Sequence, residues 1–159
     1  MNFVESMVTK LEILKNRIVI VMNPLTDKDI NWRPHKDGNS IAILILLMNE
    51  IVRYRLESIF FELLDERDID KEINKSIVLT KSEVSTISEH SINTLIHLIQ
   101  ALSQEDFLRQ PYLKNLPTQS AIINTNETTI LDICLQIFTN LTEYGGQIFY
   151  LANMRLASQ

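Results

Sequence analysis

The amino-acid sequence predicts an all-α protein, a four-helix bundle that forms a single domain over residues 1–159. Apolar residues recur at steps of three and four over four long segments, which is the spacing of one helix face. Only 3 Gly and 4 Pro interrupt the chain, and its length is sufficient for one hydrophobic core. Four long helices are too few for a solenoid and pack most simply as a bundle. We expect helices near residues 3–22, 40–65, 80–103 and 128–156, with little strand outside residues 110–127.

The first helix is indicated by an apolar stripe that ends at Asn23-Pro24, because the residue before a proline is pushed out of the α region. That stripe comprises Val4, Met7, Val8, Leu11, Leu14, Ile18 and Val21. We interpret residues 27–38 as a loop, after which Asn39 or Ser40 can cap a second helix. This helix is apolar nearly all round in its first two turns, so it is expected to be central. The charged residues 65–74 are typical of a solvated connection.

The third helix begins at a capping box of Thr80 and Glu83, in which each side chain accepts a hydrogen bond from a free backbone N–H. Its stripe comprises Val84, Ile87, Ser91, Leu95, Leu98 and Leu102. Periodicity is then lost, and residues 112–126 are expected to form a short hairpin or an irregular loop. Thr128 or Thr129 caps the last helix, whose stripe comprises Ile130, Cys134, Ile137, Leu141, Ile148 and Leu151. A connection this long argues against short-loop up-down wiring throughout.

Composition argues against several classes of function. The net charge is -5 and no long Lys/Arg cluster is present, so nucleic-acid binding is not expected. The single cysteine, Cys134, allows no intramolecular disulfide and fits a reducing compartment. The longest apolar run, residues 41–48, is far shorter than the roughly 20 residues of a membrane helix, and Glu5 stands where a signal peptide would be apolar. We expect a cytoplasmic protein that binds neither nucleic acid nor membrane.

Two stretches resemble the DinB/YfiT-like family of bacterial four-helix bundles. Residues 31–34 (NWRP) and 38–42 (GNSIA) are similar to the family's W-x-P…G-x-N-S-I-A run into its second helix. Residues 146–152 (GQIFYLA) are similar to its H-x-G-Q-I-x-Y-L-A ending. Their order and spacing also match, so the resemblance covers nearly the whole chain. It implies the family's fold and, for its better-understood members, a divalent metal held by three histidines that serves hydrolysis or the transfer of low-molecular-weight thiols.

The sequence departs from the family pattern at the metal ligands. The positions that the resemblance assigns to the three histidines hold Leu47, Asn140 and Tyr144. Leucine has no donor atom, asparagine is a poor ligand for zinc or nickel, and a neutral tyrosine must lose a proton with a pKa near 10 before it binds. We therefore carry over the fold and expect a degenerate metal site, with no catalytic residue and no cofactor.

The spacing of the residues around these positions predicts a cleft. At about 100° per residue, one face of the last helix carries Gln136, Asn140, Tyr144 and Gln147. The second helix similarly groups Leu47, Glu50 and Tyr54. In the packing that the resemblance implies, the two faces oppose each other and form a pocket of mixed polarity. This pocket could receive a small molecule or a peptide, or it could be a remnant cleft filled by Tyr144 and water.

Two classes of function stay open. The first is a non-catalytic bundle that binds a small ligand or another protein chain. The second is a metal-dependent hydrolase or low-molecular-weight-thiol S-transferase that uses zinc or nickel at a displaced site. Such a site would need carboxylates, because His90 and His97 lie about 10 Å apart along one helix and cannot share an ion, while His35 lies in a loop. Glu50 and Glu143 offer an acid–base pair, although helical glutamates are usually solvated.

Three further features concern packing. Cys134 lies on an apolar stripe and is expected to be an inert core residue rather than a nucleophile. Gly145 and Gly146 fall inside the last helix, where each destabilises by about 1 kcal/mol relative to alanine; close approach of another helix, a kink or ligand access could explain them. The first helix also carries apolar residues off its main stripe, which predicts association as a homodimer; they include Phe3, Ile13 and Ile20.

Overall fold

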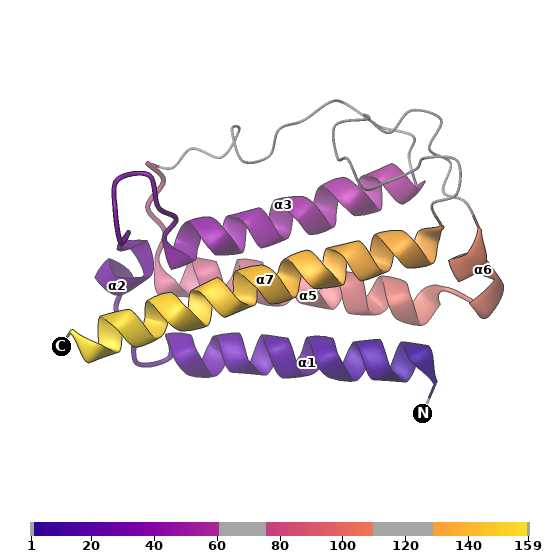
Figure 1. The fold of residues 1–159 in the computed structure, drawn as a ribbon, viewed down its shortest axis with the longest axis horizontal. Coiled ribbons are helices and arrows are strands. Elements are labelled where there is room, and N and C mark those ends of the chain that lie inside the picture. The colour runs from indigo at the N-terminus through magenta and orange to yellow at the C-terminus, as the bar shows by residue number, and fades with distance from the viewer. Residues whose placement is uncertain (1, 61–75, 110–128, 159) are drawn as a thin grey trace.

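The computed structural model describes residues 2–60, 76–109 and 129–158, without the side chains of residues 57–60. Within these ranges four long helices lie side by side (Figure 1): α1 (Phe3–Met22), α3 (Ile41–Phe60), α5 (Lys81–Ala101) and α7 (Ile130–Ala157). Their observed ends differ from the predicted ones by at most two residues wherever the structure describes both. The predicted all-α fold class is confirmed. The hairpin or loop expected at 112–126 and the connection expected at 65–74 lie outside the described residues.

The long helices are not wired up-down throughout. α1 and α7 run in one direction, and α3 and α5 run in the other (Figure 1). Each packs against two neighbours, in the cyclic order α1, α5, α3, α7. Because α3 and α5 are parallel, the chain must return to the same end of the bundle between them. This agrees with the expectation that simple short-loop wiring does not hold.

The core lies where the inward stripes of the four helices meet. α3 contributes most to it, because every residue from Ile41 to Ile45 is buried and the helix packs on both α5 and α7. The predicted caps also hold: Ser40 Oγ accepts from the backbone N–H of Ile43 at 3.2 Å, and Thr129 caps α7. The other fully buried side chains include Leu11, Ile18, Met22, Ile92, Leu95, Cys134, Ile137, Leu141 and Ile148.

Two short helices correct the sequence-based expectation. α2 (Asp27–Asn31) occupies the start of the segment interpreted as a loop, and α6 (Gln104–Leu108) follows α5 after a break. Each begins with its own capping box, formed by Thr26 with Asp29 and by Ser103 with Asp106. A reciprocal cap satisfies the free backbone N–H groups of the first turn. Such a cap supports a single turn of helix that is too short to show periodicity.

Asp29 joins α2 to the end of α7. Its carboxylate is 3% exposed and has a partner on each oxygen. Oδ2 accepts from the Thr26 backbone N–H at 3.0 Å and from its hydroxyl at 2.7 Å, whereas Oδ1 accepts from Nε and Nη2 of Arg155 at 2.9 and 2.8 Å. The guanidinium of Arg155 also lies 5.0 Å from the ring centroid of Trp32. The hydrogen bonds from Thr26 and then from Arg155 lower the pKa of Asp29 to about 2.

The start of α5 is held to the same end of the bundle. The amide of Asn31 donates to the Leu79 carbonyl oxygen at 2.7 Å and accepts from the Leu79 N–H at 3.1 Å. The backbone N–H of Lys81 donates to Asp27 at 2.8 Å, and its ammonium group donates to two backbone carbonyl oxygens of the α1–α2 turn, each at 3.0 Å. Three segments distant in sequence therefore meet here: the α1–α2 turn with α2, the start of α5 and the end of α7.

The two adjacent glycines of α7 have different surroundings. Gly145 is buried against α1, and a Cβ there would lie 2.6 Å from Cδ1 of Leu14. This glycine therefore allows the close approach of α1 and α7. Gly146 is exposed, and a Cβ there would meet no atom within 4 Å. Of the expected explanations, close approach of another helix applies to Gly145. It does not apply to Gly146, because no described helix of the chain lies against that residue.

This contrast predicts opposite effects of two neighbouring substitutions. Gly146→Ala is expected to raise the free energy of unfolding by up to about 1 kcal/mol, because alanine favours helix and the site is open. Gly145→Ala places its methyl group against the buried Leu14. The free energy of unfolding of this variant is therefore expected to be lower than that of Gly146→Ala by at least about 1 kcal/mol. Urea denaturation of dilute protein measures both. Equal stability of the two variants would contradict the described α1–α7 contact.

Asp29→Asn is expected to destabilise the protein by about 2 kcal/mol at neutral pH. The folded-state pKa of Asp29 lies below its ordinary value of 3.8, so this contribution is complete above about pH 4 and is lost as the pH falls toward 2. The stability difference between wild type and variant should therefore shrink over that range. Urea denaturation followed by the fluorescence of Trp32, the single tryptophan, measures it. Asp37→Asn, at an exposed loop residue, is the matched control and should change little.

Candidate functional site

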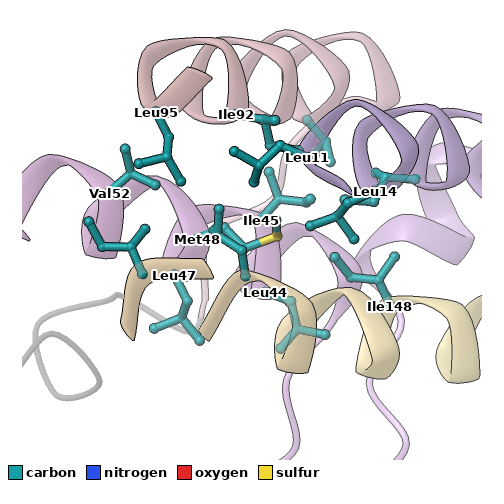
Figure 2. Close-up of a cluster of buried hydrophobic side chains, with 14 of the residues drawn as sticks. Leu11, Leu14, Leu44, Ile45, Leu47, Met48, Val52, Ile92, Leu95 and Ile148 are labelled. Carbon is teal, nitrogen blue, oxygen red and sulfur yellow. The ribbon is translucent and has the colours of Figure 1, made fainter. Parts of the chain in front are cut away.

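The predicted cleft falls on the seam between α3 and α7, which pack against each other and run antiparallel. Leu47 is 2% exposed and belongs to the core. Figure 2 shows Leu44 and Leu47 reaching from α3 toward α7, while Ile92 and Leu95 of α5 lie on the other side of α3. The position that the resemblance assigns to a metal ligand on this helix is thus occupied by buried hydrocarbon.

Most of the residues of α7 that were predicted to line the cleft are partly buried. Asn140 and Tyr144 are half-buried, and the Tyr144 ring packs on the core. Because the helices are antiparallel, successive turns of α3 meet successive turns of α7 in reverse order. We therefore expect Leu47 at the level of Tyr144, with Tyr54 at the level of Gln136. Convergence of Leu47, Asn140 and Tyr144 on one point stays a prediction.

The neighbouring residues named for the cleft differ in exposure and partners. Glu50 is half-buried and forms an ion pair with Arg53 one turn later. Tyr54 is half-buried, and the Arg55 guanidinium lies 5.9 Å from its ring centroid. Burial lowers the pKa of Arg55. Gln147, in contrast, is exposed. The other polar residues that were predicted to line the cleft are all partly buried.

Gln136 carries an unsatisfied acceptor. The residue is half-buried, yet its Oε1 atom is buried and accepts no hydrogen bond within the described part of the chain. A buried amide oxygen without a donor is destabilising, typically by about 1–3 kcal/mol, so such an atom requires a physical reason. A bound donor group would satisfy it. Spacing groups Gln136 with Asn140 and Tyr144 on one face of the helix, but only the structure shows that its oxygen lacks a donor within the described residues.

The donor set on this seam does not fit a divalent metal. Leu47 offers no lone pair, and the amide oxygen of Asn140 and the phenol of Tyr144 are weak neutral ligands. Over residues 2–60, 76–109 and 129–158, no three His, Cys, Asp or Glu side chains gather at a point where they could hold one ion. The three histidines, His35, His90 and His97, are all exposed.

An apolar pocket that sequence reasoning missed lies at the opposite end of the bundle from α2. It has a volume of about 380 Å³ and is formed where α6 meets the first turns of α1 and α7. The rings of Phe3 and Phe107 pack edge to face there, with centroids 5.7 Å apart. The pocket is lined by Asn2, Phe3, Val4, Gln104, Phe107, Leu108 and Leu131. Its walls depend on α6, which has no periodic signal in the sequence.

The fold defines an all-α helical-bundle protein. The chain belongs to the family described as protein of unknown function DUF1572, whose model matches residues 1–157. The fold is also similar to the crystal structure of a conserved protein from Enterococcus faecalis, with a TM-score of 0.73, 15% identity and 99% of each chain covered. At that identity the likeness concerns the fold alone. No curated protein matches the chain.

Two further findings bear on classes of function. None of the described helices combines the length and the apolar character required to cross a membrane. Cys134 is buried with 0% exposure, and burial raises the pKa of its thiol to about 11. Because the thiolate is the nucleophilic form, both effects oppose reactivity at this residue. This agrees with the expectation of an inert core cysteine.

Cys134 is expected to resist alkylation in the folded protein. With the thiol pKa raised to about 11, the thiolate fraction at pH 8 is roughly 100-fold lower than in the unfolded chain, and burial slows access further. Iodoacetamide labelling followed by mass spectrometry should therefore be at least about 100-fold slower in buffer than in urea. Because the chain has a single cysteine, one rate describes the whole reaction. Equal rates in the two conditions would contradict the described burial.

Proposed function

We propose that this chain is a divergent DinB/YfiT-like bundle that acts by binding rather than by catalysis. The observation that carries the proposal is Leu47, whose buried side chain stands where the resemblance places a metal ligand. Asn140 and Tyr144 replace the other two histidines and supply no imidazole lone pair. The chain thus keeps the framework of that family and lacks its ligand set.

The α3–α7 seam is the ligand site that we favour. Gln136 offers a buried acceptor, Tyr54 and Tyr144 offer half-buried rings, and Glu50 supplies a carboxylate at the edge. Buried polar atoms next to aromatic surface are typical of small-molecule sites, where a few polar groups fix the ligand's orientation. A small ligand with a hydrogen-bond donor and an apolar body would complement these groups.

The competing function is catalysis by zinc or nickel at a displaced site, as a hydrolase or a low-molecular-weight-thiol S-transferase. Metal analysis of protein purified without an affinity tag separates the two. We expect far less than one equivalent of zinc, nickel or manganese per chain, whereas near-stoichiometric metal would overturn the binding proposal. A thermal-shift screen then identifies ligands, since a molecule that binds the native state raises the melting temperature. The cytoplasmic location stays a prediction.

A triple substitution tests the family assignment at the site itself. Leu47→His, Asn140→His and Tyr144→His together are expected to create measurable zinc or nickel affinity, because three imidazoles on one seam can share an ion. Each single variant should bind no more metal than wild type. Titration calorimetry measures the affinity, and circular dichroism confirms that the variant is folded. A folded triple variant that binds no metal would show that the three positions do not converge.

A further inference from the structure

The apolar pocket beside α6 has walls that are fixed by contacts within the chain. Each of the three helices that form it, α1, α6 and α7, begins with a capping box that holds its first turn. The backbone N–H of Ile130 donates to the carbonyl oxygen of Arg109 at 2.9 Å, which joins the end of α6 to the start of α7. The edge-to-face contact of Phe3 with Phe107 joins α6 to α1. The pocket is therefore formed before any ligand binds, as small-molecule sites usually are.

Two large apolar side chains of the pocket are open to solvent. Phe3 is 42% exposed and Leu108 is 68% exposed, whereas Phe107 is 5% exposed. Val4 and Leu131 complete the apolar lining at partial burial. Apolar surface around a cavity of about 380 Å³ is unfavourable in water, and a ligand that covers it gains free energy. This volume falls in the range of small-molecule pockets, roughly 300–1,000 Å³, which favours a small molecule over a protein segment.

The charged residues next to the pocket lining are mostly acidic. Within one helical turn of a lining residue, the described part of the chain carries four carboxylates and one cation; these are Glu5, Glu105, Asp106, Asp132 and Arg109. The cation is already paired, because Nη1 of Arg109 lies 3.2 Å from Oδ1 of Asp106. This end of the bundle therefore has an excess of negative charge among its described residues.

The capping boxes hold three of these carboxylates in place. Oε2 of Glu5 accepts from the backbone N–H of Asn2 at 3.0 Å, so this carboxylate lies beside a residue that lines the pocket. Hydrogen bonds from the hydroxyl and backbone N–H of their N-cap residues lower the pKa of both Asp106 and Asp132. The N-terminus of a long helix carries a partial charge of about +0.5, which is smaller than the charge of the carboxylate that caps it. The pocket therefore favours a cation and disfavours a carboxylate or phosphate ligand.

We propose that this pocket binds a small organic cation, in which an apolar body of the size of a phenylalkyl group ends in an ammonium group. The apolar body covers the exposed surfaces of Phe3 and Leu108. The ammonium group faces the acidic rim, which we define as Glu5 and Glu105, and it is also attracted to the face of an aromatic ring. The amide of Gln104, which lines the pocket, supplies a neutral hydrogen-bond acceptor. The site lies on α1, α6 and the first turn of α7 and does not depend on the α3–α7 seam (Figure 1).

Three probes that share one apolar body test the charge preference: phenylbutylammonium, phenylbutanol and phenylbutanoate. NMR titration of isotope-labelled protein gives the dissociation constant of each probe and shows which backbone amides respond. The ammonium is expected to bind at least about tenfold tighter than the carboxylate, with the alcohol between them. The largest shifts should fall at Phe3, Leu108 and Leu131. Absence of ammonium binding, a carboxylate that binds as tightly, or shifts confined to the α3–α7 seam would overturn the proposal.

A charge reversal at an exposed position tests the acidic rim. Glu105→Lys should weaken binding of phenylbutylammonium about three- to tenfold and strengthen binding of phenylbutanoate, because it exchanges attraction for repulsion at the rim. Glu89→Lys makes the same change at an exposed residue of α5 outside the pocket and should alter either affinity by less than about twofold. Equal effects of the two variants would show that the rim does not select the charge of the ligand.

A second pair of variants tests the apolar wall. Leu108→Ser removes a side chain that is 68% exposed, so it should leave the fold intact and weaken all three probes together. Val78→Ser removes a 75% exposed side chain outside the pocket and is the matched control, with no effect expected. Circular dichroism confirms that both variants are folded. Unchanged binding by a folded Leu108→Ser variant would exclude this pocket as the site.

Discussion

The end of the bundle at α2 depends on the contacts of the buried Asp29 carboxylate. Its two oxygens serve different partners: one completes the cap of α2, and the other binds the guanidinium of Arg155 near the end of α7. A charge this deeply buried is stable only while both sets of donors are present. The same arginine also lies over the ring of Trp32, which holds the C-terminal turn of α7 beside the segment that follows α2.

The residues that carry the family resemblance serve mostly to build this end. Asn31 hydrogen-bonds the segment before α5, Trp32 stacks with Arg155, and Ser40 caps α3. These contacts need no ligand and explain why a bundle can keep the motif without the chemistry. A likeness in such residues therefore supports a shared fold and says little about catalysis, which depends on the side chains along the α3–α7 seam.

Periodicity was sufficient for the long helices because each buries a continuous stripe, and Asn23-Pro24 and Thr80 mark two of their ends. It could not reveal α2 or α6, since five residues complete barely one helical turn and depend on capping boxes that read as ordinary polar loops. The convergence of Leu47, Asn140 and Tyr144, which rests on motif spacing, stays a prediction. The unsatisfied oxygen of Gln136 and the pocket beside α6 could not be predicted, because both depend on which side chains meet in three dimensions.

The two glycines of α7 show how far sequence alone can separate folding from function. Each of the two adjacent glycines destabilises the helix by a similar free energy, and the sequence does not show which of them allows close packing. The structure divides them: Gly145 admits Leu14 of α1, whereas Gly146 faces outward. Gly146 lies on an exposed face of α7 that also carries Glu143 and Tyr150, and within the described residues no packing contact accounts for it.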